Sequence, residues 1–164
     1  MNKLQVSIVM SSSDDWVIMQ EAERQLQDFG VAYDARVISA HHSPELLFDY
    51  IKDMTAQGVQ CFIAGAGGAA HLAGMVASKT ALPVLGVPIP SKYLKGMDTL
   101  LSIVQMPKGI PVATFAIGEA GAANAGLFAV AMLALNDAKL ADRLAKFRKQ
   151  QAEAIAATTL PPVN

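Results

Sequence analysis

The chain has 164 residues, which is enough for one domain with a sizeable core. Its net charge of −1 at pH 7 gives no indication of a basic surface for nucleic acid or anionic membranes. Only 16% of the residues are charged, against roughly 25% in an average soluble domain. We therefore expect part of the surface to be buried between identical subunits.

The first third of the chain alternates apolar runs with helical patterns. Residues 6–10 are apolar and β-branched, which is typical of a strand covered on both faces. From Asp15, apolar residues recur at helical spacing until Gly30, a natural C-terminal cap. A second strand is predicted over residues 35–38, and a helix capped by Ser43 follows it.

The same alternation continues to the end of the chain. Further strands are predicted over residues 59–64, 84–87 and 112–116. Further helices are predicted over residues 69–80, 96–106 and 119–136, and a last amphipathic helix contains Leu140, Leu144 and Phe147. This order predicts an α/β, three-layer, doubly wound parallel sheet with an extra C-terminal helix. We assign residues 1–157 to a single domain and residues 158–164, with Pro161 and Pro162, to a tail.

The sequence also bears on the location of the protein in the cell. The 17 residues 120–136 carry no charge, but Gly121 and Gly126 favour a closely packed buried helix over a membrane span. The single cysteine, Cys61, forms no internal disulfide, which indicates a reducing compartment. Residues 1–5 lack the apolar stretch of a signal peptide. We expect a cytoplasmic protein.

Ligands of such sheets bind beyond the carboxyl ends of the strands, so the loops there deserve inspection. The loop after the first strand reads Ser11-Ser12-Ser13-Asp14-Asp15. Hydroxyls and N–H groups at a helix N-terminus can hold a phosphate, and a carboxylate suits the hydroxyls of a ribose. An ordinary helix cap explains the same residues, and both interpretations stay open.

The loops after the second and third strands hold all three histidines. His41 and His42 follow the second strand, and histidine exchanges protons near neutral pH. Residues 64–71 are rich in glycine, which permits positive φ and close approach of a ligand, and they end at His71. Each loop is a weak signal alone. Three of them at one end of one sheet predict a binding site for a small molecule.

Two other functions of such folds fit the sequence poorly. A phospho-receiver domain needs an aspartate at the end of the third strand, where this chain has Ala64-Gly65-Ala66. A flavin-binding module needs aromatic walls and a phosphate loop rich in threonine and glycine after the first strand. Aromatic residues make up only 6% of this chain, and residues 11–15 are serines and aspartates.

Taken together, these residues resemble the bacterial N5-carboxyaminoimidazole ribonucleotide mutase family, from about Val6 to Phe147. The matching blocks are Ser12, Asp15-Trp16, Ser39-Ala40-His41, residues 64–72, residues 84–88, residues 102–107, residues 109–112 and residues 120–125. The Gln105-Met106-Pro107 block and residues 122–125 are typical of the mutases rather than of the related carboxylases that use carbon dioxide directly.

The resemblance implies a flavodoxin-like fold, a homo-octamer and an isomerase of purine (IMP) biosynthesis that needs no metal and no cofactor. Such an enzyme moves a carboxylate from N5 to ring carbon 4 and gives 4-carboxy-5-aminoimidazole ribonucleotide. Carbon dioxide is held between the two steps. Because that molecule is neutral and escapes easily into water, we expect a small, closed pocket without strong charges.

The resemblance also implies roles for individual residues. His41 is expected to be the catalytic acid and base, and Asp15 to contact the ribose hydroxyls. The backbone of Gly67 and Gly68, together with His71, is expected to surround the base and its carboxylate. Further substrate contacts are expected from the same three loops: Ser11, Ser12, Asp14, Ser39, Ala40, His42 and Leu72.

The chain departs from the family pattern within these loops. The family usually has glycine at position 11, serine at 14 and arginine at 42, where this chain has Ser11, Asp14 and His42. The arginine clamps the substrate phosphate, and loss of such a charge-assisted contact costs about 1.5–3 kcal/mol, or roughly ten- to a hundredfold in binding. We expect a weaker hold on the phosphate, or one that improves when His42 is protonated.

These departures leave alternative functions open. One is an aminoimidazole ribonucleotide carboxylase that uses free carbon dioxide. Another is a relative with a changed substrate, or an inactive paralogue that binds a ribotide or acts in assembly. A direct assay of the carboxylated and uncarboxylated ribotides distinguishes them.

Overall fold

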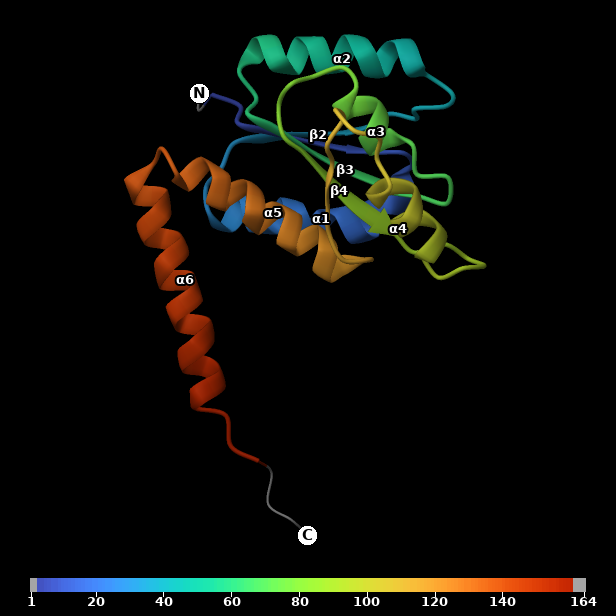
Figure 1. Ribbon diagram of the computed structural model, residues 1–164. Helices are drawn as coiled ribbons and strands as arrows, with labels where there is room; N and C mark the ends of the chain where they lie inside the picture. Colours follow the sequence, from blue (N-terminus) through green and yellow to red (C-terminus); the bar gives the residue numbers. More distant parts are fainter. Residues whose placement is uncertain (1–2, 161–164) are drawn as a thin grey trace.

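The computed structural model describes residues 3–160, and a five-stranded parallel sheet forms its centre (Figure 1). The strands are β1 (Val6–Met10), β2 (Tyr33–Val37), β3 (Cys61–Gly67), β4 (Val84–Ile89) and β5 (Ala113–Thr114). They lie in the order β2-β1-β3-β4-β5. This is the flavodoxin-like order, in which the direction of winding reverses between β1 and β3. The predicted fold class is confirmed.

Helices cover both faces of the sheet and make it the middle of three layers (Figure 1). They are η1 (Ser13–Asp15), α1 (Trp16–Asp28), α2 (Pro44–Gln57), α3 (Leu72–Ala77), α4 (Met97–Val104), α5 (Glu119–Ala134) and α6 (Ala138–Ala156). The first core cluster joins α1 and α5 to one face, and the second joins α2, α3 and Ile103 of α4 to the other.

The central strand β1 shows how the sequence specifies these layers. All five of its residues are buried, because both faces of the sheet are covered. Successive side chains point to opposite faces, so Ile8 joins the cluster under α1 and Val9 joins the cluster under α2. Ser7 also faces α2, where its hydroxyl donates to Tyr50 Oη over 2.7 Å. Tyr50 in turn donates to Asp34 Oδ2 over 2.6 Å.

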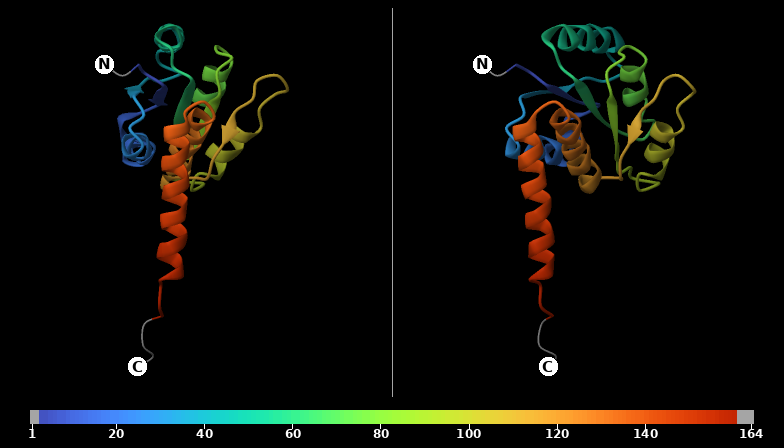
Figure 2. Two further views of the ribbon diagram at one scale, coloured as in Figure 1. Left: turned by 90° about the vertical axis from the view of Figure 1, so that its left-hand side faces the viewer. Right: turned by 60° about the vertical axis from the view of Figure 1, so that its left-hand side comes forward.

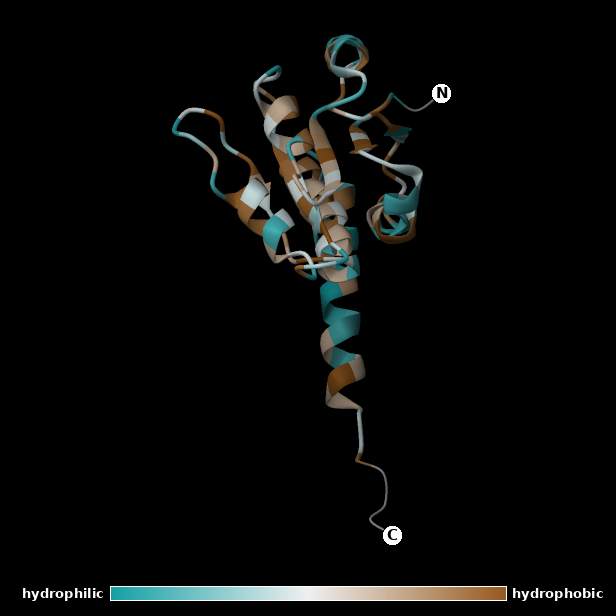
Figure 3. Ribbon diagram, turned by 90° about the vertical axis from the view of Figure 1, so that its right-hand side faces the viewer, coloured by the Kyte–Doolittle hydropathy of each residue, from teal (hydrophilic) through white to brown (hydrophobic). Residues whose placement is uncertain are grey.

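The uncharged run near the C-terminus forms the predicted helix, α5, but only one face of it is buried, and Asn124 and Phe128 are exposed. Its small residues let α5 approach α1 closely: a Cβ at Gly126 would lie 2.8 Å from the carbonyl oxygen of Ala22. The strands of the sheet are coloured mainly as apolar, whereas the part of α6 just beyond the body is coloured as polar (Figure 3). Within residues 3–160 no helix combines the length and apolar character needed to cross a membrane.

Helix α6 starts on the body of the molecule and then projects away from it (Figures 1 and 2). Arg143 anchors its first half by donating to the carbonyl oxygens of Asp28 and Phe29, each over 2.7 Å, at the end of α1. Phe147 packs edge-on against Phe29, with 5.5 Å between ring centroids. From Arg148 to Leu160 every residue is exposed. The second half of α6 is therefore surrounded by solvent in the single chain.

Several predicted bounds are corrected by the structure. The predicted strand over 112–116 shrinks to β5, and the predicted helix over 69–80 shrinks to α3. Ser43 does stand at the N-cap of α2, but its side chain makes no capping hydrogen bond. Its Oγ donates instead to the carbonyl oxygen of Ser39 over 3.0 Å. Pro161 and Pro162 of the predicted tail lie outside the described residues.

Candidate active site

The three loops singled out from the sequence begin side by side at the carboxyl edge of the sheet. In the strand register Met10, the last residue of β1, pairs with both Val37 of β2 and Gly65 of β3. Backbone bonds continue this alignment past Met10: Ser11 N donates to Gly65 O over 3.3 Å, and Ile38 N donates to Met10 O over 2.9 Å. The loops meet where the winding of the sheet reverses, which is the usual ligand position.

The first loop is built around a capping box. Ser12 Oγ accepts from Asp14 N over 3.2 Å, and Asp15 Oδ2 accepts from Ser12 N over 3.0 Å. Asp15 is only 8% exposed. Burial raises the pKa of its carboxyl group, repulsion from Asp14 adds to this, and the hydrogen bonds from the Ser12 and Ser11 backbone oppose it. The cap interpretation therefore holds for Ser12 and Asp15, and it leaves Oδ1 of Asp15 for a ligand.

The second loop is closed by Ser39. Its Oγ accepts from the backbone N–H of His42 over 3.2 Å and also lies 3.0 Å from the Nδ1 atom of the same histidine. The ring of His42 is thereby held by one nitrogen, which leaves Nε2 as its contact atom for a ligand. Ala40 is only 4% exposed and its side chain belongs to the core, so any contact from Ala40 to a ligand must come from its backbone.

His41 reaches across to the third loop and meets His71. The Nε2 atom of His41 lies 2.7 Å from Nδ1 of His71, and the two rings stand at 82° to each other. One nitrogen of this bond carries the proton and the other accepts it. Within residues 3–160 no group of three or more His, Cys, Asp or Glu residues is placed to hold a metal ion.

The third loop turns sharply at its two glycines. Gly67 is exposed, and Gly68 has a φ of +62°, which favours glycine. The N–H of Gly68 donates to Oγ1 of Thr99 on α4 over 2.9 Å. Sequence reasoning missed Thr99, which is completely buried. The sequence gives one signal for it: Thr99 is a polar residue one helical turn before Ile103, on the apolar side of the predicted helix.

Leu72, like Ala40, can contact a ligand only through its backbone. Its side chain is 1% exposed and packs in the core under α2 and α3. It therefore anchors the start of α3 and does not present its side chain to a ligand. His71, directly before it, is the N-cap residue of α3 and is exposed.

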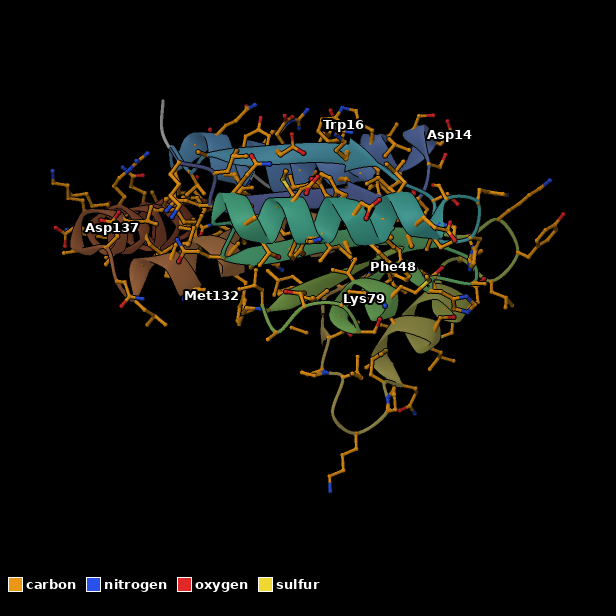
Figure 4. All side chains as sticks on the ribbon, turned by 90° about the horizontal axis from the view of Figure 1, so that it is seen from above. Asp14, Trp16, Phe48, Lys79, Met132 and Asp137 are labelled. Atoms are coloured by element: carbon orange, nitrogen blue, oxygen red, sulfur yellow. The ribbon has the colours of Figure 1, made fainter. Side chains whose placement is uncertain are left out.

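The expected closed pocket is not present in the single chain. His41, Gly67 and His71 are all exposed. A hollow of about 340 Å³ lies beside His71, between α3 and the segment around Met106. On the outer side of the first loop, Trp16 and Val37 border a hollow of about 380 Å³. Asp14 lies at one end of the molecule and Asp137, before α6, at the other, so the site is remote from the start of α6 (Figure 4).

Comparison with known proteins identifies the family. The family model described as AIR carboxylase matches residues 5–154. The chain belongs to the AIR carboxylase family. An N5-carboxyaminoimidazole ribonucleotide mutase from Vibrio parahaemolyticus is 52% identical over 158 residues, 96% of this chain and 98% of the relative. The mutase of the same name from Saccharolobus solfataricus is 53% identical over 155 residues, 94% and 97% of the two chains.

Solved structures of AIR carboxylase family members agree with this assignment. The crystal structure of Treponema denticola PurE superposes with a TM-score of 0.85 and is 29% identical in sequence. The superposition covers 93% of this chain and 94% of the other. The family model reaches residue 154 and so includes most of α6 (Ala138–Ala156).

Proposed function

We propose that this chain is an N5-carboxyaminoimidazole ribonucleotide mutase of purine biosynthesis, an isomerase. Full-length similarity to mutases supports the assignment. The structural observation that carries it is the contact between His41 Nε2 and His71 Nδ1 beside the glycine loop. A proton donor and acceptor is what this isomerisation needs, because one proton must reach nitrogen and another must leave carbon.

We assign the proton transfers to His41. In the first step its ring gives a proton to N5 of the substrate while the N5–carboxylate bond breaks, which releases carbon dioxide and the aminoimidazole ribotide. Ring carbon 4 then attacks the carbon dioxide and forms the new carbon–carbon bond. The proton on carbon 4 returns to His41, which restores the aromatic ring. The histidine ends in its starting state, and atoms and charge balance without a further reactant.

We assign the sugar and the base to separate loops. Oδ1 of Asp15 is the acceptor for a ribose hydroxyl, since Oδ2 is used by the Ser12 N–H. Ser11, Ser12 and Asp14 border the same position on the first loop. The exposed backbone at Gly67 and the ring of His71 lie next to His41, where the base and its carboxylate must sit for proton transfer.

We assign the phosphate to the second loop. Ser39 Oγ holds Nδ1 of His42 and leaves its Nε2 for a phosphate oxygen, and the backbone of Ser39 and Ala40 is assigned to the same ligand. A protonated imidazole donates a charge-assisted hydrogen bond to an anion, and a neutral one donates a weaker bond. The affinity of the site for a ribotide should therefore depend on pH more than that of an arginine site would.

We also propose that the chain works as a cytoplasmic homo-octamer, with residues 1–157 as one domain and residues 158–164 as a tail. Exposed apolar side chains support the assembly: Tyr93 and Leu94 before α4, and Met97 and Leu101 within it, are 85%, 61%, 53% and 53% exposed. Monomers rarely leave such a group of side chains uncovered. Covering them would also enclose the open site. Light scattering should give eight times the chain mass of 17.3 kDa.

A turnover assay with two substrates tests the proposed activity. Purified protein is given either the N5-carboxylated ribotide or the uncarboxylated ribotide with bicarbonate, and the 4-carboxy product is followed by NMR. We expect rapid conversion of the first substrate without ATP or metal. Conversion of only the second would identify a carboxylase, and no conversion between pH 6 and 8 would identify an inactive paralogue.

A further inference from the structure

We propose that Thr99 is a positioning residue for the reaction, because its hydroxyl fixes the Gly67–Gly68 peptide beside the catalytic imidazoles. Oγ1 of Thr99 accepts the N–H of Gly68 over 2.9 Å. Thr99 has no exposed surface and lies on α4, outside the three loops that carry the other assigned residues. This inference rests on the proposed function and adds one residue to its machinery.

The bond decides which groups the glycine loop offers to a ligand. The peptide unit is planar and trans, so the carbonyl group of Gly67 points away from the N–H of Gly68. With that N–H directed at Thr99, the Gly67 carbonyl is directed away from α4. The Gly68 N–H is therefore withdrawn from the donors available to the migrating carboxylate.

Gly68 is conformationally free, so its orientation depends on a hydrogen bond from outside the loop. Gly68 has a φ of +62°, and a Cβ placed there would meet no atom within 4 Å. Packing therefore does not restrain this residue, and glycine populates both signs of φ about equally. Strand pairing with Ile89 restrains Gly67 on one side of this peptide, and the hydrogen bond to Thr99 fixes the direction of the Gly68 N–H on the other. Without that bond, Gly68 can turn its N–H toward the ligand side.

Contacts at both ends of helix α4 fix the position of Thr99. Ser91 Oγ donates to Asp98 Oδ1 over 2.6 Å and accepts from Gly96 N over 3.2 Å, which ties the first turn to the end of β4. One turn after Thr99, Ile103 packs on β4 so closely that a Cβ at Gly86 would lie 2.6 Å from its Cγ2. Both contacts fix the height of Thr99 above the sheet.

Matched substitutions of Thr99 test the inference. Thr99→Val keeps the shape and removes the acceptor, whereas Thr99→Ser keeps the hydroxyl. We expect Thr99→Val to lower kcat roughly tenfold, the effect of about one lost hydrogen bond, while KM for the ribotide changes less than about twofold. Thr99→Ser should keep at least about half of the wild-type kcat. Thr99→Ala serves in place of Thr99→Val if the valine variant does not fold.

Hydrogen exchange followed by mass spectrometry supplies a readout independent of turnover. The peptide containing Gly68 should exchange faster in Thr99→Val than in the wild type and Thr99→Ser. An unchanged kcat or unchanged exchange in Thr99→Val overturns the inference, as does a serine variant as impaired as the valine variant. If the wild-type protein shows no turnover, the proposed function is wrong, and Thr99 has no catalytic role. If the wild type is active but hydrogen exchange is unchanged in Thr99→Val, only the inference about Thr99 is wrong.

Discussion

His41 and His71 stand thirty positions apart in the chain, and their ring nitrogens lie 2.7 Å from each other. The contact joins the loop after β2 to the loop after β3, across the end of β1. One ring nitrogen of this contact donates and the other accepts, so His71 orients the His41 ring beside the glycine loop. The proposed proton donor and acceptor is thus held in place by a residue of the third loop.

Replacement of His41 should abolish turnover and spare binding. In His41→Asn, the asparagine side chain is polar and of similar length, but it does not exchange a proton near neutral pH. General acid–base catalysis typically contributes 10²–10⁴-fold to the rate. We expect kcat to fall by at least about a hundredfold, with ribotide affinity by calorimetry within about threefold of the wild type. An unchanged rate would remove His41 from the mechanism.

Replacement of His42 by arginine should strengthen binding of the substrate phosphate. Arginine keeps its charge at every pH of the assay, so His42→Arg should lower KM roughly tenfold at pH 8. His42→Gln, which carries no charge at any pH, is the control and should show a KM at least as high as that of the wild type. An arginine variant whose KM equals that of the wild type speaks against a phosphate role.

The buried carboxyl group of Asp15 should make stability depend on pH. Burial raises its pKa in the folded protein above the unfolded value, so the folded state binds this proton more tightly. The resulting stabilisation is fully present below the unfolded pKa and is lost as pH rises through the folded pKa. Asp15→Asn has no such proton, so its stability relative to the wild type should increase between about pH 3.5 and neutral pH. Urea unfolding over that range measures it, and a relative stability that decreases contradicts the assignment.

The hydroxyl of Tyr50 should contribute to stability through its two partners. Burial, assisted by the Asp34 carboxylate, raises the pKa of Tyr50, so the hydroxyl keeps its proton and bridges Ser7 and Asp34. Tyr50→Phe leaves the fully buried Ser7 hydroxyl without a partner, which should cost about 1–3 kcal/mol of unfolding free energy. The double variant with Ser7→Ala should be more stable than the two separate losses together imply, and strict additivity would show that the hydroxyls do not interact.

Local signals in the sequence account for the elements that were predicted well. The two ends of α2 follow from Pro44 and from Gly58, which has a φ of +93° at the C-cap. β1 follows from a short run of apolar, mostly β-branched residues that only Ser7 interrupts. These features depend on neighbours a few residues away, and any single sequence displays them.

Features that depend on distant partners were not accessible in the same way. β3 runs on to Gly67 because that residue pairs with Ile89 on β4, although glycines seldom indicate a strand. The predicted site residues converge because parallel strands end at one edge, but the contact of Thr99 with Gly68 needs the position of α4. The burial of Leu72 and Ala40 also emerged only from packing.

The capping box of the first loop has a consequence for how this lineage can change. Ser12 and Asp15 form the cap of η1, directly before α1, through two hydrogen bonds, whereas the side chains of Ser11 and Asp14 make none within residues 3–160. Mutations at the first pair break the cap, and those at the second pair leave its hydrogen bonds in place. Ser11 and Asp14 are the two positions of this loop at which the chain departs from the family pattern. Drift in selectivity has a permitted route here that leaves folding untouched.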